Sequence, residues 1–384
     1  MAASDSSVQS ANKLKEILNR IATKNIPDYV FEWFFRYFAG GPKRFKSEPV
    51  DLLENYMALI SAAKIMLKHK YDTGIYGKII KDTQTPHWTY YFVGDTHGSF
   101  QDTYTMIDYF IKVFQINPYI KIVFLGDYVD RNPFDLQNLA FIISFWLLFH
   151  ENVFILRGNH EDSSVCSRYG FSQHLFEKSG SKDRFTPIWD SVNALFSKLP
   201  VGISCLIGEK RILALHGGFP FDVSQGKDYT PINLELLEPQ LNCFQEEHFE
   251  MDKFSQTILW ADPDPDNLPD GGVAPSPRTG RPRFSQQAFN LFMDLNKYDI
   301  LIRGHQKFTL GYKLLWQNRL ISLFSTSTYD GKLIGKAKFL RLQPKTKRFE
   351  IGDEEIGKGF GILAVDPEFL ENQLHQYYHA ATNA

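Results

Sequence analysis

The feature that most constrains this chain is a series of polar clusters, each of which directly follows a short apolar run typical of a β-strand. The clusters are VGDTHG (93–98), LGDYVDRN (125–132), LRGNHED (156–162), LHGG (215–218) and IRGHQ (302–306). In open α/β sheets, ligands bind beyond the carboxyl ends of the strands. Because every cluster pairs glycine with Asp, Asn or His, the five together predict one site at the edge of a sheet.

From residue 89 onward, β-rich runs alternate with helix-length segments. The runs are 89–93, 121–125, 153–156, 212–215, 300–302 and 320–324. Helix-like segments at 101–114 and 136–149 fill the first two gaps. Short strands separated by helices predict parallel strands joined by crossovers, so we expect an α/β fold with a buried sheet.

Four further segments, two of them helical runs, carry weaker signals. Apolar residues recur at helical spacing on both sides of the aromatic segment DYVFEWFFRYFAGG (28–41). We expect this segment to pack on the core as a cap, with docking of a partner as the alternative. The segment 262–283 holds six prolines, so we expect no regular element there.

Composition excludes several classes of protein. With 42 basic and 44 acidic residues, no global charge favours nucleic acid or an anionic membrane. The three cysteines lack CxxC spacing, which favours a reducing compartment such as the cytoplasm. The most apolar stretch, 139–149, is shorter than the ~20 residues that span a bilayer, so we expect no transmembrane segment. The first residues contain no secretory signal, and delivery by an unrecognised signal stays open.

The clusters contain six candidate metal ligands. They are Asp95, His97, Asp127, Asn159, His216 and His305. Oxygen ligands mixed with neutral imidazole suit manganese, iron or zinc. Six ligands exceed the need of one small cation, and they predict a site for two divalent metal ions ~3.5–4 Å apart.

Residues beside these ligands predict phosphoester hydrolysis. Arg131 follows the aspartates, and its guanidinium matches phosphate oxygens in a bidentate geometry. His160 is the best candidate for the general acid, because it adjoins Asn159 and can stay outside the metal shell. Asp130 is expected to orient this imidazole.

For the remaining histidines and neighbouring aspartates we expect ordinary structural roles. These histidines are His69, His87, His150, His174, His248, His375 and His379. Asp102, Asp135 and Asp162 are expected to cap helices or turns.

The motifs GDTHG, GDYVDRN, RGNHE, HGG and RGHQ, in this order, resemble those of the PPP family of metal-dependent serine/threonine protein phosphatases. The stretches RYGF (168–171), LPVGISCLIGEKRILALHGG (199–218), ILWADPDPD (258–266) and LISLFSTSTYDG (320–331) are similar to family stretches as well. The resemblance covers roughly residues 52–343. It implies a calcineurin-like metallophosphoesterase fold, a central β-sandwich flanked by helices. We expect an N-terminal helical extension (1–51), a catalytic domain (52–343) and a C-terminal extension (344–384) packed on or trailing it.

The resemblance also implies roles for individual residues. One metal would be held by Asp95, His97 and bridging Asp127, and the second by Asp127, Asn159, His216 and His305. Arg131, Asn159, Arg278 and Tyr329 would contact the substrate phosphate, with Arg281 and Arg283 open as alternatives to Arg278. His160 and Asp130 would form the acid dyad.

The implied function is hydrolysis of phosphoserine and phosphothreonine in proteins by a hydroxide bridging two metal ions, manganese in vitro and iron or zinc natively. Alternatives are a nucleotide or dinucleotide polyphosphatase, a broad phosphoesterase that includes phosphotyrosine, and an inactive scaffold. A regulatory protein is a further expected partner, through the N-terminal aromatic segment or the C-terminal extension.

Three departures from the family pattern bear on substrate preference. Asn132 replaces a usual glycine, and we expect it to keep a left-handed turn. The loop STSTY (325–329) and the proline-rich loop before Arg278 are the other two.

Overall fold

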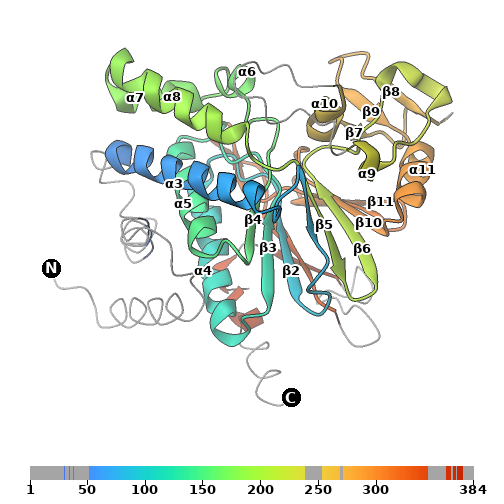
Figure 1. Ribbon diagram of the computed structural model, residues 1–384, viewed down its shortest axis with the longest axis horizontal. Coiled ribbons are helices and arrows are strands. Elements are labelled where there is room, and N and C mark those ends of the chain that lie inside the picture. The colour runs from blue at the N-terminus through green and yellow to red at the C-terminus, as the bar shows by residue number, and fades with distance from the viewer. Residues whose placement is uncertain are drawn as a thin grey trace.

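The computed structural model describes residues 52–237, 253–268, 271–344, 360–364, 366–368 and 370–374, together with Val30, Phe34 and Phe38. Two β-sheets form the centre of the molecule, with helices on their outer sides (Figure 1). Helices α3 (Leu52–Asp72), α4 (Phe100–Ile116) and α5 (Asp135–Leu148) lie on one side in this view, and α9 (Leu234–Leu237), α10 (Lys253–Trp260) and α11 (Gln286–Asn296) lie on the other.

One sheet has five strands. In spatial order they are β16 (Phe360–Ala364), β15 (Lys338–Leu342), β2 (Thr89–Val93), β3 (Ile120–Phe124) and β4 (Val153–Ile155). Strands β2, β3 and β4 are parallel, and β15 runs antiparallel to both β2 and β16. The crossovers between the parallel strands contain α4 (Phe100–Ile116) and α5 (Asp135–Leu148), as the sequence predicts.

The other sheet has six strands of mixed direction. In order they are β1 (Ile79–Asp82), β5 (Gly202–Ile207), β6 (Lys210–Leu215), β10 (Ile300–Arg303), β12 (Leu320–Leu323) and β11 (Tyr312–Leu315). Alternate residues of these strands point to opposite faces. Ile203 and Ile212 join the core shared with the five-stranded sheet, whereas Leu213 and Leu215 join a second core on the outer face. The predicted β-sandwich is therefore present.

Helices cover both outer faces because each presents an apolar side. All 14 residues of α5 are buried, which explains the continuous apolar run in the sequence. Helix α3 (Leu52–Asp72), α7 (Phe171–Ser179) and α8 (Lys182–Phe196) complete this side. On the other side, α10 (Lys253–Trp260) and α11 (Gln286–Asn296) contribute Ile258, Phe289 and Phe292 to the second core, and the short α9 (Leu234–Leu237) adds Leu234.

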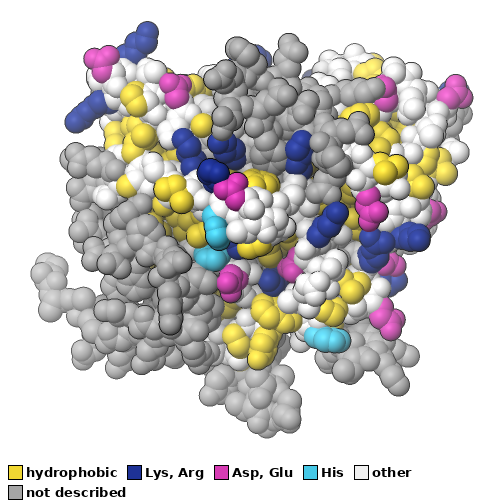
Figure 2. Space-filling model, viewed as in Figure 1, with side chains coloured by type: hydrophobic (Ala, Val, Ile, Leu, Met, Phe, Trp, Pro, Cys, Tyr) yellow, Lys and Arg dark blue, Asp and Glu magenta, His cyan; other side chains and the backbone are white. Residues whose placement is uncertain are grey.

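The strand predictions at 89–93, 121–125, 153–156, 212–215, 300–302 and 320–324 are all confirmed to within one or two residues. In the described part of the chain, no helix combines the length and apolarity needed to cross a membrane. Lysine, arginine and carboxylate side chains are dispersed among apolar ones over the face shown in Figure 2.

The expectation of no regular element at 262–283 is wrong. Three short strands, β7 (Asp262–Pro263), β8 (Val273–Pro275) and β9 (Pro282–Phe284), form a small sheet in the order β7-β9-β8. Proline is tolerated where no ladder hydrogen bond is donated, as at a strand end. Pro275 and Pro282 face each other at the end of the β8–β9 pair, so both stand at such positions.

The N-terminal aromatic segment is described at three residues. Val30 and Phe34 are buried, and the Phe34 ring stacks on Phe141 of α5 with centroids 5.1 Å apart. These residues pack on the core, as expected for a cap. Nearly all of the predicted extension 1–51, much of 344–384, and Cys243, His248, His375 and His379 lie outside the described residues. Strand β16, which falls in the predicted C-terminal extension, pairs with β15.

Candidate active site

The predicted site residues lie on loops at the carboxyl ends of strands from both sheets. Asp95 follows β2, Asp127 follows β3, Asn159 follows β4, His216 follows β6 and His305 follows β10. Backbone hydrogen bonds join the loops. His97 N donates to Asp127 O at 2.9 Å, Ser325 N donates to Asp95 O at 3.0 Å, and Gly304 N donates to His216 O at 3.0 Å.

Several of these residues have left-handed backbones. The φ angles are 41° at His97, 55° at Asp127, 70° at Asp130, 73° at Arg131 and 70° at His305. Non-glycine residues adopt this region at a cost, and such strained positions cluster at functional sites. The loops therefore adopt strained backbone conformations, which orient the side chains of the site.

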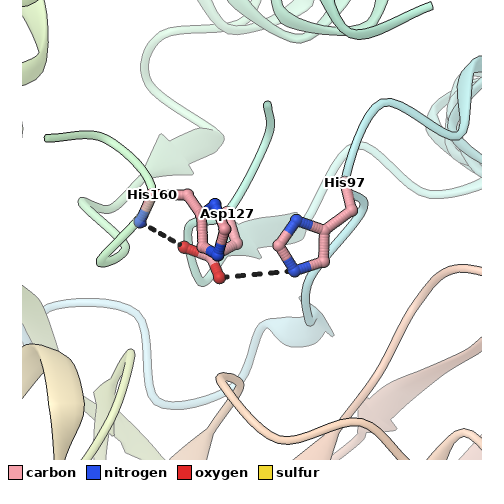
Figure 3. Close-up of side chains that lie close together, drawn as sticks. All are labelled: His97, Asp127 and His160. Carbon is pink, nitrogen blue, oxygen red and sulfur yellow. Dashed lines mark hydrogen bonds and ion pairs between the residues drawn. The ribbon is translucent and has the colours of Figure 1, made fainter. Parts of the chain in front are cut away.

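Asp127 lies at the centre of the cluster. His97, Asp127 and His160 offer potential metal-binding atoms within 4.8 Å of one another, and so do Asp127, His216 and His305. In Figure 3, His97 Nε2 lies 3.5 Å from Asp127 Oδ2, and the His160 amide donates to Asp127 Oδ1 at 2.9 Å. A carboxylate placed between two such groups has the position expected of a bridging ligand.

Asp95 and Asn159 complete the arrangement on either side of Asp127. Asp95 Oδ2 is 3.8 Å from His97 Nε2. Asn159 Oδ1 lies 2.9 Å from His216 Nε2 and 2.7 Å from His305 Nδ1. All six residues predicted as metal ligands are thus brought together.

Two buried polar atoms of this cluster lack hydrogen-bond partners. They are Asp95 Oδ2 and His305 Nε2. A buried acceptor without a partner is costly unless a cation or another donor satisfies it. The Val129 and Leu125 carbonyls lie 3.0 Å and 2.9 Å from the Nδ1 atoms of His97 and His216. Since a carbonyl only accepts, both Nδ1 atoms donate, which leaves both Nε2 atoms facing the cluster, an arrangement typical of metal-binding histidine.

The electrostatics of the cluster are those of concentrated, buried charge. Burial raises the pKa of Asp95, and the neighbouring charge of Asp127 raises it further. Burial alone would raise the pKa of Asp127, but the imidazoles of His216 and His160 hold it well below its usual range. Burial lowers the pKa of His97 to about 3. The site therefore contains an ionised central carboxylate beside a neutral imidazole, which suits a divalent cation.

His160 and Asp130 form a close pair beside this cluster. His160 Nδ1 is 2.6 Å from Asp130 Oδ2, and both side chains are buried. Burial would lower the pKa of His160, but the charge of Asp127 and the bond to Asp130 outweigh it and raise this pKa. A raised pKa favours the protonated imidazolium, the form that can donate a proton.

Arg131 and Tyr329 lie together at the rim. The Arg131 guanidinium is 4.0 Å from the ring centroid of Tyr169 and 5.0 Å from that of Tyr329. Tyr329 belongs to a hairpin formed by β13 (Thr328–Tyr329) and β14 (Lys332–Leu333), whose turn carries Asp330, 3.4 Å from Arg131. Burial raises the pKa of Tyr329 to about 12, so its hydroxyl is neutral and able to donate.

The three arginines of the β8–β9 hairpin lie in different places. Arg278 is exposed on the connection between the strands. Arg283 pairs with Asp264 and donates to Pro275 O at 3.2 Å. Arg281 lies 5.2 Å from the ring centroid of Trp260, whose ring is 5.6 Å from that of His305. The contacts therefore connect Arg281, and not Arg278, to the cluster.

Sequence reasoning assigned no role to two buried charged residues at the site. Glu161 accepts hydrogen bonds from the amides of Asp127, Tyr128 and Gly158 at 2.7, 2.8 and 2.9 Å. Arg303, fully buried, donates to Asp262 Oδ1 at 2.9 Å. Both residues lie inside the polar clusters that follow the strands, and this position in the sequence could have identified them as residues of the site.

The aspartates expected to cap helices or turns differ among themselves. Asp162 is confirmed as the N-cap of α6 (Ser163–Cys166), where it accepts from Ser164 N at 2.9 Å. Asp102 instead lies in the first turn of α4 and accepts from Ser327 N at 2.7 Å, which ties the STSTY loop to this helix.

The expectation of a left-handed backbone at Asn132 is wrong. Asp130 and Arg131 adopt that conformation, whereas Asn132 is not among the residues with positive φ. Its side chain is buried instead and donates to His97 O at 2.7 Å and to Thr328 O at 2.9 Å. Asn132 therefore joins the His97 loop to the hairpin that carries Tyr329.

Comparison with known proteins connects this geometry to a family. Residues 89–307 match the family model described as calcineurin-like phosphoesterase. The serine/threonine-protein phosphatase PP2A-like PPG1 of Candida albicans is 27% identical over 282 residues, 72% of this chain and 61% of that protein. A protein phosphatase 2A catalytic chain of Dictyostelium discoideum is 28% identical over 285 residues, 73% of this chain and 79% of that protein.

A solved structure of 22% sequence identity has the same fold. It is a protein serine/threonine phosphatase from Saccharomyces cerevisiae with similarity to human phosphatase PP5. The two chains are 22% identical, with a TM-score of 0.62 over 84% of this chain and 95% of the other.

Proposed function

Because the chain belongs to the calcineurin-like phosphoesterase family, we propose that it hydrolyses phosphoserine and phosphothreonine monoesters in proteins. The observation that carries this proposal is the position of Asp127 between two groups of metal-binding side chains, with the His160–Asp130 pair beside them. The names of the two relatives, both serine/threonine or type 2A protein phosphatases, support a protein substrate.

The family implies divalent metal ions, and the residues present fit two of them. Asp95, His97 and Asp127 would hold one ion, and Asp127, Asn159, His216 and His305 would hold the other. Bound ions of this kind supply a hydroxide nucleophile and neutralise charge on the phosphoryl oxygens. We assign manganese as the activating metal in vitro and iron or zinc as the native pair, on the basis of the mixed oxygen and imidazole donors.

The other residues of the site would bind and protonate the substrate. The Arg131 guanidinium, 5.0 Å from the ring centroid of Tyr329, and the Tyr329 hydroxyl would bind phosphate oxygens, and Asn159 would contact the same group. His160, held by Asp130, would donate its proton to the leaving serine or threonine oxygen. Asp130 accepts the imidazole N–H throughout and keeps the proton-donating nitrogen directed toward the substrate.

A second arginine on the β8–β9 hairpin would complete the phosphate site. Arg281 takes this role in preference to Arg278, because its guanidinium packs on Trp260 beside His305. Arg281→Ala should raise KM for a phosphopeptide and weaken inhibition by inorganic phosphate, whereas Arg278→Ala should leave both nearly unchanged. The reverse order would return the role to Arg278.

A test of the function compares substrates on one preparation. We expect manganese-dependent hydrolysis of matched phosphoserine and phosphothreonine peptides that collapses in Asp95→Asn and His160→Asn variants, by roughly 100-fold or more for the general acid. Preference for a dinucleotide polyphosphate would establish the nucleotide alternative, and equal rates on a phosphotyrosine peptide would establish a broad phosphoesterase. Two bound metals without turnover would establish a scaffold.

Further proposals concern the chain as a whole. We place the catalytic domain at 52–343, between an N-terminal helical extension at 1–51 and a C-terminal extension at 344–384. A regulatory protein would bind through the aromatic segment 28–41 or the C-terminal extension. A cytoplasmic location follows from the cysteine usage.

A further inference from the structure

A second histidine–aspartate pair lies directly behind the His160–Asp130 pair. His174, on α7, places Nδ1 3.0 Å from both carboxylate oxygens of Asp135, the first residue of α5. The Asp135 side chain is fully buried, and that of His174 is 26% exposed. The sequence suggested only a satisfied surface histidine and a helix cap at these two positions, and the function proposed above does not use them.

Asp135 contacts the backbone of Asp130. Its Oδ2 accepts from Asp130 N at 3.3 Å, and its Oδ1 accepts from Leu136 N at 2.8 Å. Asp130 has a left-handed backbone at φ 70°, a costly conformation that surrounding contacts, such as a side-chain acceptor for its amide, must hold in place. Asp135 supplies that acceptor, and in this way the orientation of the dyad aspartate depends on the second pair.

The segment that carries His174 is also joined to the dyad loop by hydrogen bonds from two backbone amides. Arg131 N donates to Tyr169 O at 3.1 Å, and Phe171 N donates to Asp130 Oδ1 at 2.9 Å. The imidazole of His174 packs against the backbone at Gly170, where a Cβ would be 3.2 Å from the ring carbon Cε1. The start of α7 and the loop 130–135 are therefore joined by backbone hydrogen bonds and by side-chain contacts, including the Arg131–Tyr169 and His174–Asp135 contacts.

His174 helps to keep the buried Asp135 carboxylate ionised. Burial raises the pKa of Asp135, and the negative charge of Asp130 raises it too, whereas the hydrogen bond and charge of His174 lower it. Without a donor at position 174, the buried Asp135 carboxylate would lose a side-chain hydrogen-bond partner and would be protonated or displaced. Either change would weaken the acceptor that holds Asp130 N.

We propose that His174 and Asp135 act as a positioning pair that holds Asp130, and through it the imidazole of His160, in the orientation needed to protonate the leaving group. This inference rests on the proposed function, because it needs a general acid at His160. Neither residue is placed in contact with substrate.

The test uses the dependence of rate on the leaving group. An activated leaving group such as dinitrophenolate departs without a proton, whereas phenolate and the serine alkoxide need one. The substitution His174→Leu removes the donor, and His174→Asn keeps one, because asparagine Nδ2 takes the position of histidine Nδ1. Gln173→Ala, on the same helix, removes only an exposed contact to Glu177 and serves as the control.

We expect His174→Leu to lower kcat/KM by roughly tenfold for phenyl phosphate and a phosphoserine peptide, and by less than about twofold for dinitrophenyl phosphate. His174→Asn should recover most of the loss, and Gln173→Ala should match the wild type. If His174→Leu does not fold, as judged by its melting curve, His174→Gln replaces it, because glutamine holds its amide one atom further from the backbone.

Two results would overturn the inference. If the variant loses the same factor on every ester, or loses nothing, while the wild type is active, the pair does not position the acid and the proposed function stands. If the wild type hydrolyses none of the esters, the proposed function fails and the inference fails with it.

Discussion

Replacing Asn132 by glycine, the residue usual in the PPP family, should damage this protein. The Asn132 side chain donates one buried and one partly buried hydrogen bond, to His97 O and Thr328 O respectively. Each such bond contributes about 1 kcal/mol net to stability. Glycine adds a further cost of about 0.5–1 kcal/mol through the freedom of the unfolded chain. The sum predicts that Asn132→Gly lowers the free energy of unfolding by about 2–3 kcal/mol.

The same substitution should affect substrate binding. Thr328 precedes Tyr329 in the hairpin at the rim, so loss of the hydrogen bond to Thr328 O would loosen the hydroxyl that is proposed to bind phosphate. We therefore expect KM for a phosphopeptide to rise more than kcat falls. Urea denaturation followed by tryptophan fluorescence, together with steady-state kinetics on the same preparation, measures both effects.

Two matched variants separate the contributions at this position. Asn132→Ala should lose about 2 kcal/mol, because it removes the hydrogen bonds without the glycine cost. Asn132→Asp should be at least as destabilising, because a carboxylate would face two carbonyl oxygens. If Asn132→Gly instead changed the free energy of unfolding by less than about 0.5 kcal/mol and left KM unchanged, the assignment of these hydrogen bonds as a structural link would be refuted.

Three further predictions concern the metal site, the rim and pH. Asp127→Asn should reduce the metal content of the purified protein, measured by elemental analysis, from about two ions per chain, because one carboxylate serves both groups; undiminished content would exclude a bridging role. Asp330→Asn keeps a side chain suited to the turn before Gly331 but removes the carboxylate 3.4 Å from Arg131. Because Arg131 would then be free of this competing anion, Ki for inorganic phosphate should fall by up to about fivefold, which corresponds to the energy of an exposed ion pair. The hydrogen bond to Asp135 raises the pKa of His174 in the folded protein. Protonated His174 therefore stabilises the fold fully below its unfolded-state pKa of about 6.5, and this stabilisation is lost as pH rises through the folded-state pKa. Urea midpoints of wild type and His174→Asn should therefore differ more at acidic than at alkaline pH, and a difference independent of pH would contradict this assignment.

The strands at the centre of the fold could be predicted because both faces of each are covered. Strands β2 and β3 are buried at every residue and, apart from Thr89 and Lys121, consist of aliphatic and aromatic residues that lead up to Gly94 and Gly126. Among the described strands of the two main sheets, the sequence runs did not identify β1, β5, β11, β15 or β16. Strand β11 has no fully buried residue, and β1 has only two, so neither carries an apolar run long enough to stand out.

The identity of the clustered residues could be predicted, but their backbone conformation could not. Residue type indicates which side chains are able to bind a metal, and the order of the strands brings them to one edge. Because left-handed backbones are most common at glycine and asparagine, the sequence predicted the left-handed turn at Asn132. The structure places it at Asp130 and Arg131, where tertiary contacts such as Arg131 N to Tyr169 O maintain it. The local conformational preferences of residues 130–132 give no information about those contacts, so they could not predict where the turn lies.

The carboxylate of Glu161 has a consequence for motion. It binds amides that belong to two separate loops, those of Asp127 and Tyr128 after β3 and that of Gly158 after β4. Neither loop can open without breaking hydrogen bonds to the same buried group, so the two loops should open as one cooperative unit. Hydrogen–deuterium exchange should then show these three amides exchanging with a common opening free energy, and Glu161→Gln should accelerate all three together.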